Sequence, residues 1–230
     1  MKTSLPKQML KLYTYFRSSS AFRVRIALNI KELEYQSVFV HLVRNGGEHK
    51  QAEYLRKNPQ GLVPLLEIQD APDTPVTYLS QSLAMMEYLE EVYPDPAIMP
   101  SHPLQRARVR SITQAVVADI QPLNNLRVPN YLVDSLQAND EQKLEWTRHW
   151  VKLGFTALET SLANDPQTGK YCHGDSPTIA DCCLIPQIYN AERFNCPMDD
   201  YPTLQRINEQ CLNNLAFEKA LPENQLDANA

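Results

Sequence analysis

Residues 9–30 read MLKLYTYFRSSSAFRVRIALNI, and this stretch decides the fold of the first part of the chain. The leucines and tyrosines of residues 9–15 alternate between two faces, which predicts a β-strand. Phe22 and Ile26 then recur at helical spacing, with a run of serines, 18–20, directly before them. A strand that passes through a short seryl turn into a helix is typical of an α/β domain.

The same alternation of strand and helix continues to residue 93. We predict further strands over residues 34–40, 65–68 and 76–78, and helices over residues 22–30, 48–57 and 81–92. The resulting order, β-α-β-α-β-β-α, is that of a thioredoxin-like domain.

Residues 94–103 form the predicted linker, because prolines at 94, 96, 100 and 103 exclude both a helix and a central strand. After the linker only helical patterns remain, over residues 104–120, 141–162, 179–191 and 203–217. Thr178-Ile-Ala-Asp181 has the form of a capping box at the start of one of them. We therefore predict a thioredoxin-like α/β domain at 1–93, the linker at 94–103 and an all-α domain at 104–230. Composition suggests disorder only in residues 222–230.

Composition excludes several classes of function. The net charge of −5 does not suit a nucleic-acid binder, and six glycines form neither a dinucleotide fingerprint nor a P-loop. The five cysteines contain no C-x-x-C pair and the histidines are scattered, so we expect buried or half-buried free thiols and no metal. No apolar run approaches the roughly 20 residues that span a membrane. With no apolar stretch at the N-terminus, these features predict a cytoplasmic protein.

The seryl turn is the strongest candidate for a functional site. A redox-active thioredoxin-like protein carries a cysteine here, so the serines at 18–20 exclude disulfide exchange at this position. One serine could simply cap the helix. Alternatively, a serine hydroxyl and the positive end of the helix could stabilise an anion such as a thiolate. Arg17, Arg23 and Arg25 crowd the same stretch, which suggests a small anionic ligand unless they are solvated surface arginines.

Two further motifs fit a peptide-like ligand. Val63-Pro64 opens a predicted strand and is a candidate for a cis bond, which would leave the Val63 backbone free to pair with an extended peptide. Gln81-Ser82 opens the next helix, where a hydroxyl and helix amides suit a carboxylate. An ordinary strand start and an ordinary helix cap would explain the same residues.

These motifs resemble the zeta class of glutathione transferases over residues 9–220. Ser18-Ser-Ser-Ala-Phe-Arg-Val-Arg-Ile-Ala-Leu28 is similar to the class signature Ser-Ser-Cys-x-Trp-Arg-Val-Arg-Ile-Ala-Leu. The other matching motifs are Asn58-Pro59, Val63-Pro64, Gln81-Ser-Leu-Ala84, Glu87-Tyr-Leu-Glu-Glu91, Ile120-Gln-Pro-Leu123 and Asn190-Ala-Glu-Arg-Phe194. The resemblance implies a glutathione transferase fold, glutathione as cofactor and a homodimer.

The resemblance also implies roles for particular residues. It makes Ser18 the residue that activates the glutathione sulfur, assisted by Ser19 and Ser20. Arg193 and Arg17 would bind the carboxylates of a small dicarboxylate substrate. The remaining glutathione contacts that it implies are His49, where the class usually has Gln, and Val63, Gln81, Ser82, Gln121 and Asn125.

The implied activity is glutathione-dependent cis-trans isomerisation of maleylacetoacetate to fumarylacetoacetate in tyrosine and phenylalanine breakdown, by thiolate addition, rotation and elimination. Ser20 departs from the class, which often has Cys there. This difference puts side activities such as attack on α-haloacids in doubt. Three alternatives remain open: a maleylpyruvate isomerase, a general glutathione transferase, and a non-enzymatic adaptor on the same fold.

Overall fold

The computed structural model describes residues 8–228 and divides into two compact units. The first unit runs to Ile98 and also includes the chain from Leu215 onward, while the second is Met99–Asn214. The sequence had placed all of residues 104–230 in one helical domain. The structure differs because the end of the chain packs against helix α1 of the first unit, as described below.

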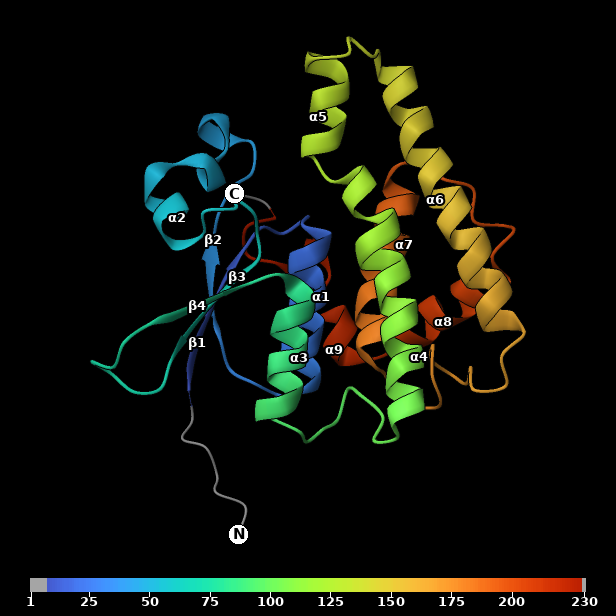
Figure 1. Cartoon of the computed structure of the whole chain (residues 1–230), viewed down its shortest axis with the longest axis horizontal. Helices are drawn as coiled ribbons and strands as arrows, with labels where there is room; N and C mark the ends of the chain where they lie inside the picture. The colour runs from blue at the N-terminus through green and yellow to red at the C-terminus, as the bar shows by residue number, and fades with distance from the viewer. Residues whose placement is uncertain (1–7, 229–230) are drawn as a thin grey trace. The chain divides into compact units, whose positions relative to one another are not determined.

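The first unit is built on a four-stranded sheet of order β2-β1-β3-β4. Strand β1 pairs parallel with β2 and antiparallel with β3, which pairs antiparallel with β4. Helices α1 and α3 lie on one face of this sheet and α2 on the other (Figure 1). The thioredoxin-like order predicted from the sequence is confirmed. Its elements are β1 (Met9–Thr14), α1 (Ser19–Ile30), β2 (Gln36–Phe39), η1 (Arg44–Gly46), η2 (Glu48–Lys50), α2 (Ala52–Lys57), β3 (Leu65–Gln69), β4 (Thr77–Ser80), α3 (Ser82–Val92), α9 (Leu215–Glu218) and η5 (Pro222–Asn224).

The register of the sheet brings four chain segments to one edge. Thr14 pairs with Phe39, and Leu65 pairs with both Tyr13 and Ser80. The carboxyl ends of β1, β2 and β4 and the amino end of β3 therefore lie side by side. The loops at this edge carry the seryl turn, His49, the Val63-Pro64 bond and the Gln81-Ser82 helix start.

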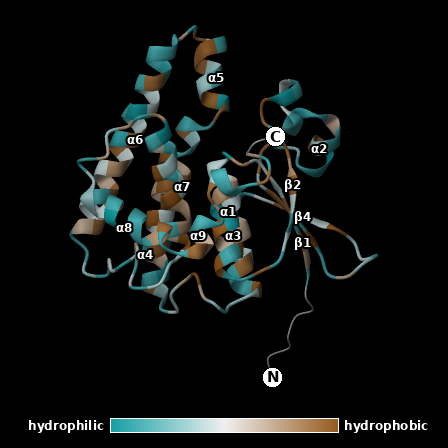
Figure 2. Cartoon of the chain, turned by 180° about the vertical axis from the view of Figure 1, so that it is seen from behind, coloured by the Kyte–Doolittle hydropathy of each residue, from teal (hydrophilic) through white to brown (hydrophobic). Residues whose placement is uncertain are grey.

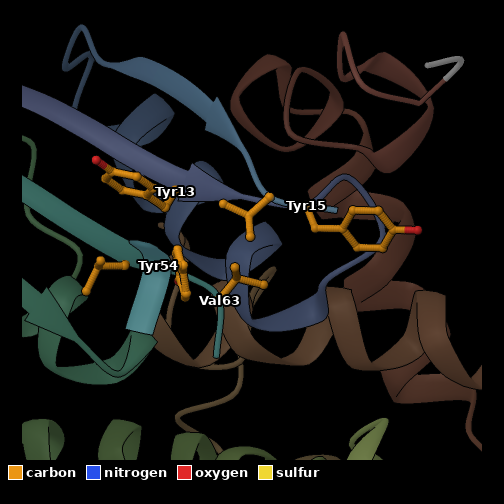
Figure 3. Packing of buried hydrophobic residues seen from close by; sticks show 6 residues of the cluster. Tyr13, Tyr15, Tyr54 and Val63 are labelled. Carbon is orange, nitrogen blue, oxygen red and sulfur yellow. The ribbon is translucent and has the colours of Figure 1, made fainter. Parts of the chain in front are cut away.

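A cluster of buried side chains beneath this edge supports it. Tyr13 of β1, Tyr15 just after it, Tyr54 of α2 and Val63 pack together, and all are buried (Figure 3). The rings of Tyr13 and Tyr54 meet edge to face, with centroids 6.0 Å apart. The side chain of Val63 is thus anchored in the core, which fixes the position of its backbone.

Helix α1 is buried on all sides. Every residue from Ala21 to Leu28 is buried, including Arg23 and Arg25, which are 2% and 0% exposed. The expectation that these two arginines form a cationic ligand site or a solvated surface is wrong. An internal helix has no solvent-facing side, so its long polar side chains must find their hydrogen-bond partners inside the protein.

The end of the chain lies against α1. Helix α9 runs beside α1 (Figure 1), and Asn29 of α1 donates a hydrogen bond to the Ala216 carbonyl at 2.9 Å. Residues 222–230 were expected to be disordered, yet Pro222 and Asp227 are buried. Residues 229–230 lie outside the described part. The contacts that hold this segment are long-range ones, which composition cannot reveal.

The second unit is helical throughout the described range, as predicted. Helix α7 is buried along most of its length and appears mainly hydrophobic in Figure 2. The Thr178–Asp181 capping box is present at its start. Periodicity missed α5, because Pro129 interrupts the pattern. The elements are α4 (Pro103–Gln114), a π-helical turn η3 (Ala115–Ile120), η4 (Pro122–Asn124), α5 (Arg127–Asp134), α6 (Asp140–Ala163), α7 (Ile179–Arg193) and α8 (Pro202–Leu212).

Within residues 8–228, none of the helices has the length and apolarity needed to cross a membrane.

Candidate functional site

Ser18 caps helix α1 and keeps its own proton available. Its Oγ accepts a hydrogen bond from the Ala21 amide at 3.2 Å. Because a hydroxyl can accept and donate at once, this capping bond leaves the Ser18 O–H free to donate outward. The two interpretations of the seryl turn are therefore compatible: the same oxygen caps the helix, and its hydrogen can reach an anion placed beyond the helix end.

The start of α1 offers further donors. The amides of Ser19 and Ser20 precede the first helical hydrogen bond, so the helix itself does not use them. No acidic residue lies in the first turn. Amides at a helix N-terminus carry the positive end of the helix dipole, which favours an anion such as a thiolate. The side chains of all three serines are partly exposed.

Val63 presents a free backbone edge. The Val63-Pro64 bond is cis, as predicted. In the described part of the chain, neither the N–H nor the C=O of Val63 takes part in a hydrogen bond. The preceding Leu62 carbonyl, in contrast, accepts from the Tyr54 hydroxyl at 2.6 Å and from Asn58 Nδ2 at 2.7 Å. These bonds hold the loop while the Val63 amide and carbonyl remain available to a peptide.

The start of α3 is held by an arginine from α1. Ser82 is buried, and its Oγ accepts a hydrogen bond from Arg23 Nη1 at 3.3 Å. Gln81 precedes it with φ 71°, a backbone region that residues other than glycine rarely adopt, and its side-chain Nε2 donates to Gln60 Oε1 at 2.8 Å. Strained backbone of this kind concentrates at ligand sites. The helix start therefore offers amides and a fixed hydroxyl to a carboxylate.

His49 lies in η2 and is buried. Burial, with a smaller contribution from Lys50, lowers its pKa, which favours the neutral imidazole. Its Nδ1 is buried with no hydrogen-bond partner among the described residues. A Cβ on Gly47 would stand 2.5 Å from the His49 ring, and one on Gly61 would stand 3.4 Å from the His49 carbonyl oxygen. Glycines on both sides thus let His49 sit close to the loop that carries Val63.

Arg17 and Ser20 complete the residues expected in the first unit. Arg17 is exposed, with its guanidinium 4.9 Å from the centre of the Phe16 ring and a hydrogen bond to the Tyr15 hydroxyl at 3.1 Å. Ser20 is the second residue of α1 and is partly exposed. Both residues adjoin Ser18 in the same turn.

The other expected residues belong to the second unit. Gln121 follows the π-helical turn η3 and is half-buried, and Asn125 accepts a local hydrogen bond from the Arg127 amide at 3.3 Å. Arg193 is exposed at the end of α7. Its guanidinium lies 4.6 Å from the centre of the Phe194 ring and donates to Asn190 Oδ1 at 3.1 Å.

Two residues that hold the seryl turn were missed in the sequence. Arg25 was expected either in a cationic ligand site or on the solvated surface, and Asp227 was expected in a disordered tail. Arg25 donates to the Phe16 carbonyl at 3.0 Å, and Asp227 accepts from the Phe16 amide at 2.9 Å. Arg25 lies between apolar residues, Val24 and Ile26, and this apolar surrounding was the available sequence signal that its helix is internal.

All five cysteines are free and buried, as predicted. Burial raises the pKa of Cys172, Cys196 and Cys211 above that of an ordinary thiol, which makes these cysteines unreactive. Among residues 8–228 there is no group of three or more His, Cys, Asp or Glu side chains that could hold a metal.

The residues at the sheet edge fit glutathione. A tripeptide with a thiol, a γ-glutamyl carboxylate and a peptide backbone needs an anion-stabilising donor, a helix N-terminus and a free backbone edge. Ser18, the Ser82 helix start and Val63 supply these features from adjacent loops. The unsatisfied Nδ1 of His49 is a further buried polar atom next to the Val63 loop.

Comparison with known proteins gives consistent results. Residues 17–92 match the family model described as glutathione S-transferase, N-terminal domain. A probable maleylacetoacetate isomerase from Vibrio cholerae is 48% identical, with 94% of this chain and 97% of that protein covered.

Two solved structures have the same fold along nearly the whole chain. A bacterial zeta-class maleylpyruvate isomerase in its holo form has a TM-score of 0.88 at 40% identity and covers 95% of this chain and 99% of its own. A maleylacetoacetate isomerase from Methylobacterium extorquens, with bound malonate and glutathione, has a TM-score of 0.88 at 39% identity and covers 96% and 100%.

The chain belongs to the glutathione S-transferase family. Within that family it is a zeta-class member, grouped with the maleylacetoacetate and maleylpyruvate isomerases.

Proposed function

We propose that this chain is a glutathione-dependent cis-trans isomerase that converts maleylacetoacetate to fumarylacetoacetate. The observation that carries the proposal is the Ser18 hydroxyl. Its oxygen caps α1, and its hydrogen remains available to donate beside two backbone amides that the helix does not use. The class relationship adds the substrate, because a relative with 48% identity is named a probable maleylacetoacetate isomerase.

Different residues bind glutathione and activate its sulfur. Val63 pairs through its backbone with the cysteinyl unit of glutathione, and Gln81 and Ser82 bind the γ-glutamyl end. Ser19, Ser20, His49, Gln121 and Asn125 complete the glutathione contacts that the class resemblance assigns. Ser18 donates its hydroxyl hydrogen to the sulfur and, with the α1 amides, lowers the thiol pKa from an unperturbed value of about 8.5.

When bound, glutathione supplies a nucleophilic sulfur whose reversible addition turns the cis double bond into a bond that can rotate. Arg193 and Arg17 bind the carboxylates of the substrate and stabilise the negative charge that develops on its oxygens. Malonate in the related Methylobacterium structure is a small dicarboxylate of the kind that such arginines recognise.

Conversion of maleylacetone, a simpler cis substrate, tests the proposal. We expect isomerisation that requires glutathione, and we expect glutathione to be recovered unchanged at the end. Retention on immobilised glutathione without any isomerisation would instead favour a binding role.

Maleylpyruvate is the second candidate substrate, because a structural relative is a maleylpyruvate isomerase. The two diacids differ by one methylene group and present the same cis double bond. A comparison of kcat/KM for the two substrates under the same conditions decides between them. A higher value for maleylpyruvate would reassign the substrate and leave the proposed chemistry unchanged.

The enzyme is also proposed to be a cytoplasmic homodimer. The homodimer follows from the class resemblance. The cytoplasmic location is supported by five cysteines that are all free and buried, as is usual where thiols stay reduced. Light scattering of the purified protein checks the first statement, and fractionation of the source cells checks the second.

A further inference from the structure

The turn that carries Ser18 is closed by a hydrogen bond of its own backbone and is also held by side chains from other parts of the chain. The Ser18 amide donates to the Tyr15 carbonyl at 3.0 Å, which makes a tight turn between β1 and α1. Phe16 lies inside this turn, and both of its backbone polar groups have side-chain partners: Asp227 near the end of the chain for the amide, and Arg25 of the adjoining helix α1 for the carbonyl. The position of the Ser18 hydroxyl therefore depends on what holds Phe16.

Arg25 holds the carbonyl side of the turn. Its guanidinium is fully buried and donates to the carbonyls of Tyr15 at 3.4 Å and Phe16 at 3.0 Å. It also donates to the Ala220 carbonyl from two nitrogens, at 3.1 and 3.0 Å. Burial lowers the pKa of Arg25 to about 10, so it stays protonated at pH 7. Arg25 thus connects the turn to the end of the chain.

Asp227 holds the amide side of the turn. It is 6% exposed, and its Oδ2 accepts the Phe16 N–H at 2.9 Å. Its other oxygen, Oδ1, is buried with no hydrogen-bond partner among the described residues. The nearby Arg25 charge interacts favourably with it. A buried carboxylate with one unsatisfied oxygen costs stability, so its presence at this position needs a physical explanation.

We propose that Asp227 is a positioning residue for Ser18: by accepting the Phe16 amide, the C-terminal segment holds the seryl turn in the geometry that stabilises the glutathione thiolate. This inference rests on the proposed function. A donor that stabilises an anion acts only when it is preorganised, and a displacement of about 1 Å is enough to weaken it strongly. Asp227 does not need to touch glutathione or substrate for this effect.

Asp227→Ala removes the acceptor and tests the inference directly. We expect the Phe16 amide to lose protection in hydrogen exchange of the ligand-free protein. We expect the pKa of the bound glutathione thiol, measured by thiolate absorbance, to rise by about one unit. At pH values below that pKa, the fraction of glutathione present as thiolate then falls about tenfold. At saturating glutathione, kcat should fall with it, and KM for the cis-diacid should change little.

Two control variants separate positioning from general damage. Asp227→Asn keeps an acceptor oxygen and should restore the thiol pKa and kcat to within about threefold of wild type. Leu226→Ala changes the neighbouring side chain, which is 87% exposed, and should leave all the measurements unchanged. If Asp227→Ala does not fold, Asp227→Ser carries the same test, because its shorter side chain cannot reach the Phe16 amide.

The result that overturns the inference is a folded Asp227→Ala or Asp227→Ser protein with wild-type thiol pKa and kcat. An Asp227→Asn variant as impaired as Asp227→Ala would also overturn it, since the hydrogen bond to Phe16 would then not be the reason. Failure of the proposed function looks different: the wild-type protein itself would not bind glutathione in calorimetry.

Discussion

Ser18→Ala removes one hydroxyl that contributes both to stability and to catalysis. The Oγ accepts the Ala21 amide at 3.2 Å, and loss of such a cap costs about 1 kcal/mol of stability. The hydroxyl hydrogen, which the cap does not use, is the proposed donor to the thiolate. Loss of one preorganised donor to an anion lowers kcat by roughly 10²-fold or more. The rate loss therefore exceeds what the small loss of stability can explain.

The assay measures kcat/KM on maleylacetone at saturating glutathione, the apparent pKa of the bound thiol, and the midpoint of thermal unfolding. Ser18→Asp separates the two contributions, because a carboxylate still caps the helix but has no proton to donate at neutral pH. We expect Ser18→Asp to unfold near the wild-type temperature while its activity falls at least as far as that of Ser18→Ala. A raised thiol pKa should accompany the loss in both variants.

Ser20 provides the matched control, since it lies in the same turn but is not the residue that caps α1. Ser20→Ala should cost clearly less activity than Ser18→Ala. Ser20→Cys, which installs the usual residue of the class, should stay within about tenfold of wild type, a barrier difference below roughly 1.4 kcal/mol. If Ser20→Ala proves the more damaging change, or if Ser18→Ala is as active as wild type, the assignment of the sulfur to Ser18 is wrong.

Three further changes test other parts of the molecule. Arg193→Met should raise KM for a dicarboxylate far more than for a neutral acceptor, and equal losses on both would favour a structural role for this arginine. His49→Gln should leave glutathione affinity nearly unchanged. Because burial lowers the His49 pKa from 6.5, wild-type stability should fall as pH drops below that value. Urea unfolding at about pH 7.5 and about pH 5 should show a smaller drop in the variant. Lys31→Met should destabilise the first unit by about 3–5 kcal/mol, since it leaves the buried Glu90 carboxylate without its 2.8 Å partner. Lys31→Met combined with Glu90→Gln should recover part of this loss in the same measurement, and no recovery would contradict the ion-pair explanation.

The elements around the site could be predicted because their signals are local. The alternation in residues 9–15 and the helical spacing after it give the β1–α1 unit, which the structure confirms. The Thr178–Asp181 capping box was likewise visible, since all of its atoms come from four consecutive residues. Motifs that need only neighbouring residues are therefore readable from the sequence, including the helix starts that carry Ser18 and Ser82.

The interior of α1 could not be predicted in the same way. Arg23 and Arg25 are charged, and charged residues are almost never fully buried unless they have partners. Their partners come from elsewhere: Arg23 bonds to Ser82 in α3, and Arg25 bonds to Ala220 near the end of the chain. The sequence shows that a partner is needed but does not show which residue supplies it.

The hydrogen bond from Phe16 to Asp227 is the extreme case, because 211 positions separate its two residues. Nothing in the residues around Asp227 predicts a buried acceptor, and composition alone favoured disorder there. The seryl turn itself is also incomplete as a local motif, since its backbone is held partly by this distant carboxylate and by the Ala220-bound Arg25. A sequence match over the turn therefore identifies the chemistry that Ser18 can perform, whereas the geometry that makes it effective depends on Asp227, far along the chain. Substitutions of Asp227 should accordingly be interpreted as changes to the seryl turn, even though this residue lies far outside the motif that identifies the turn.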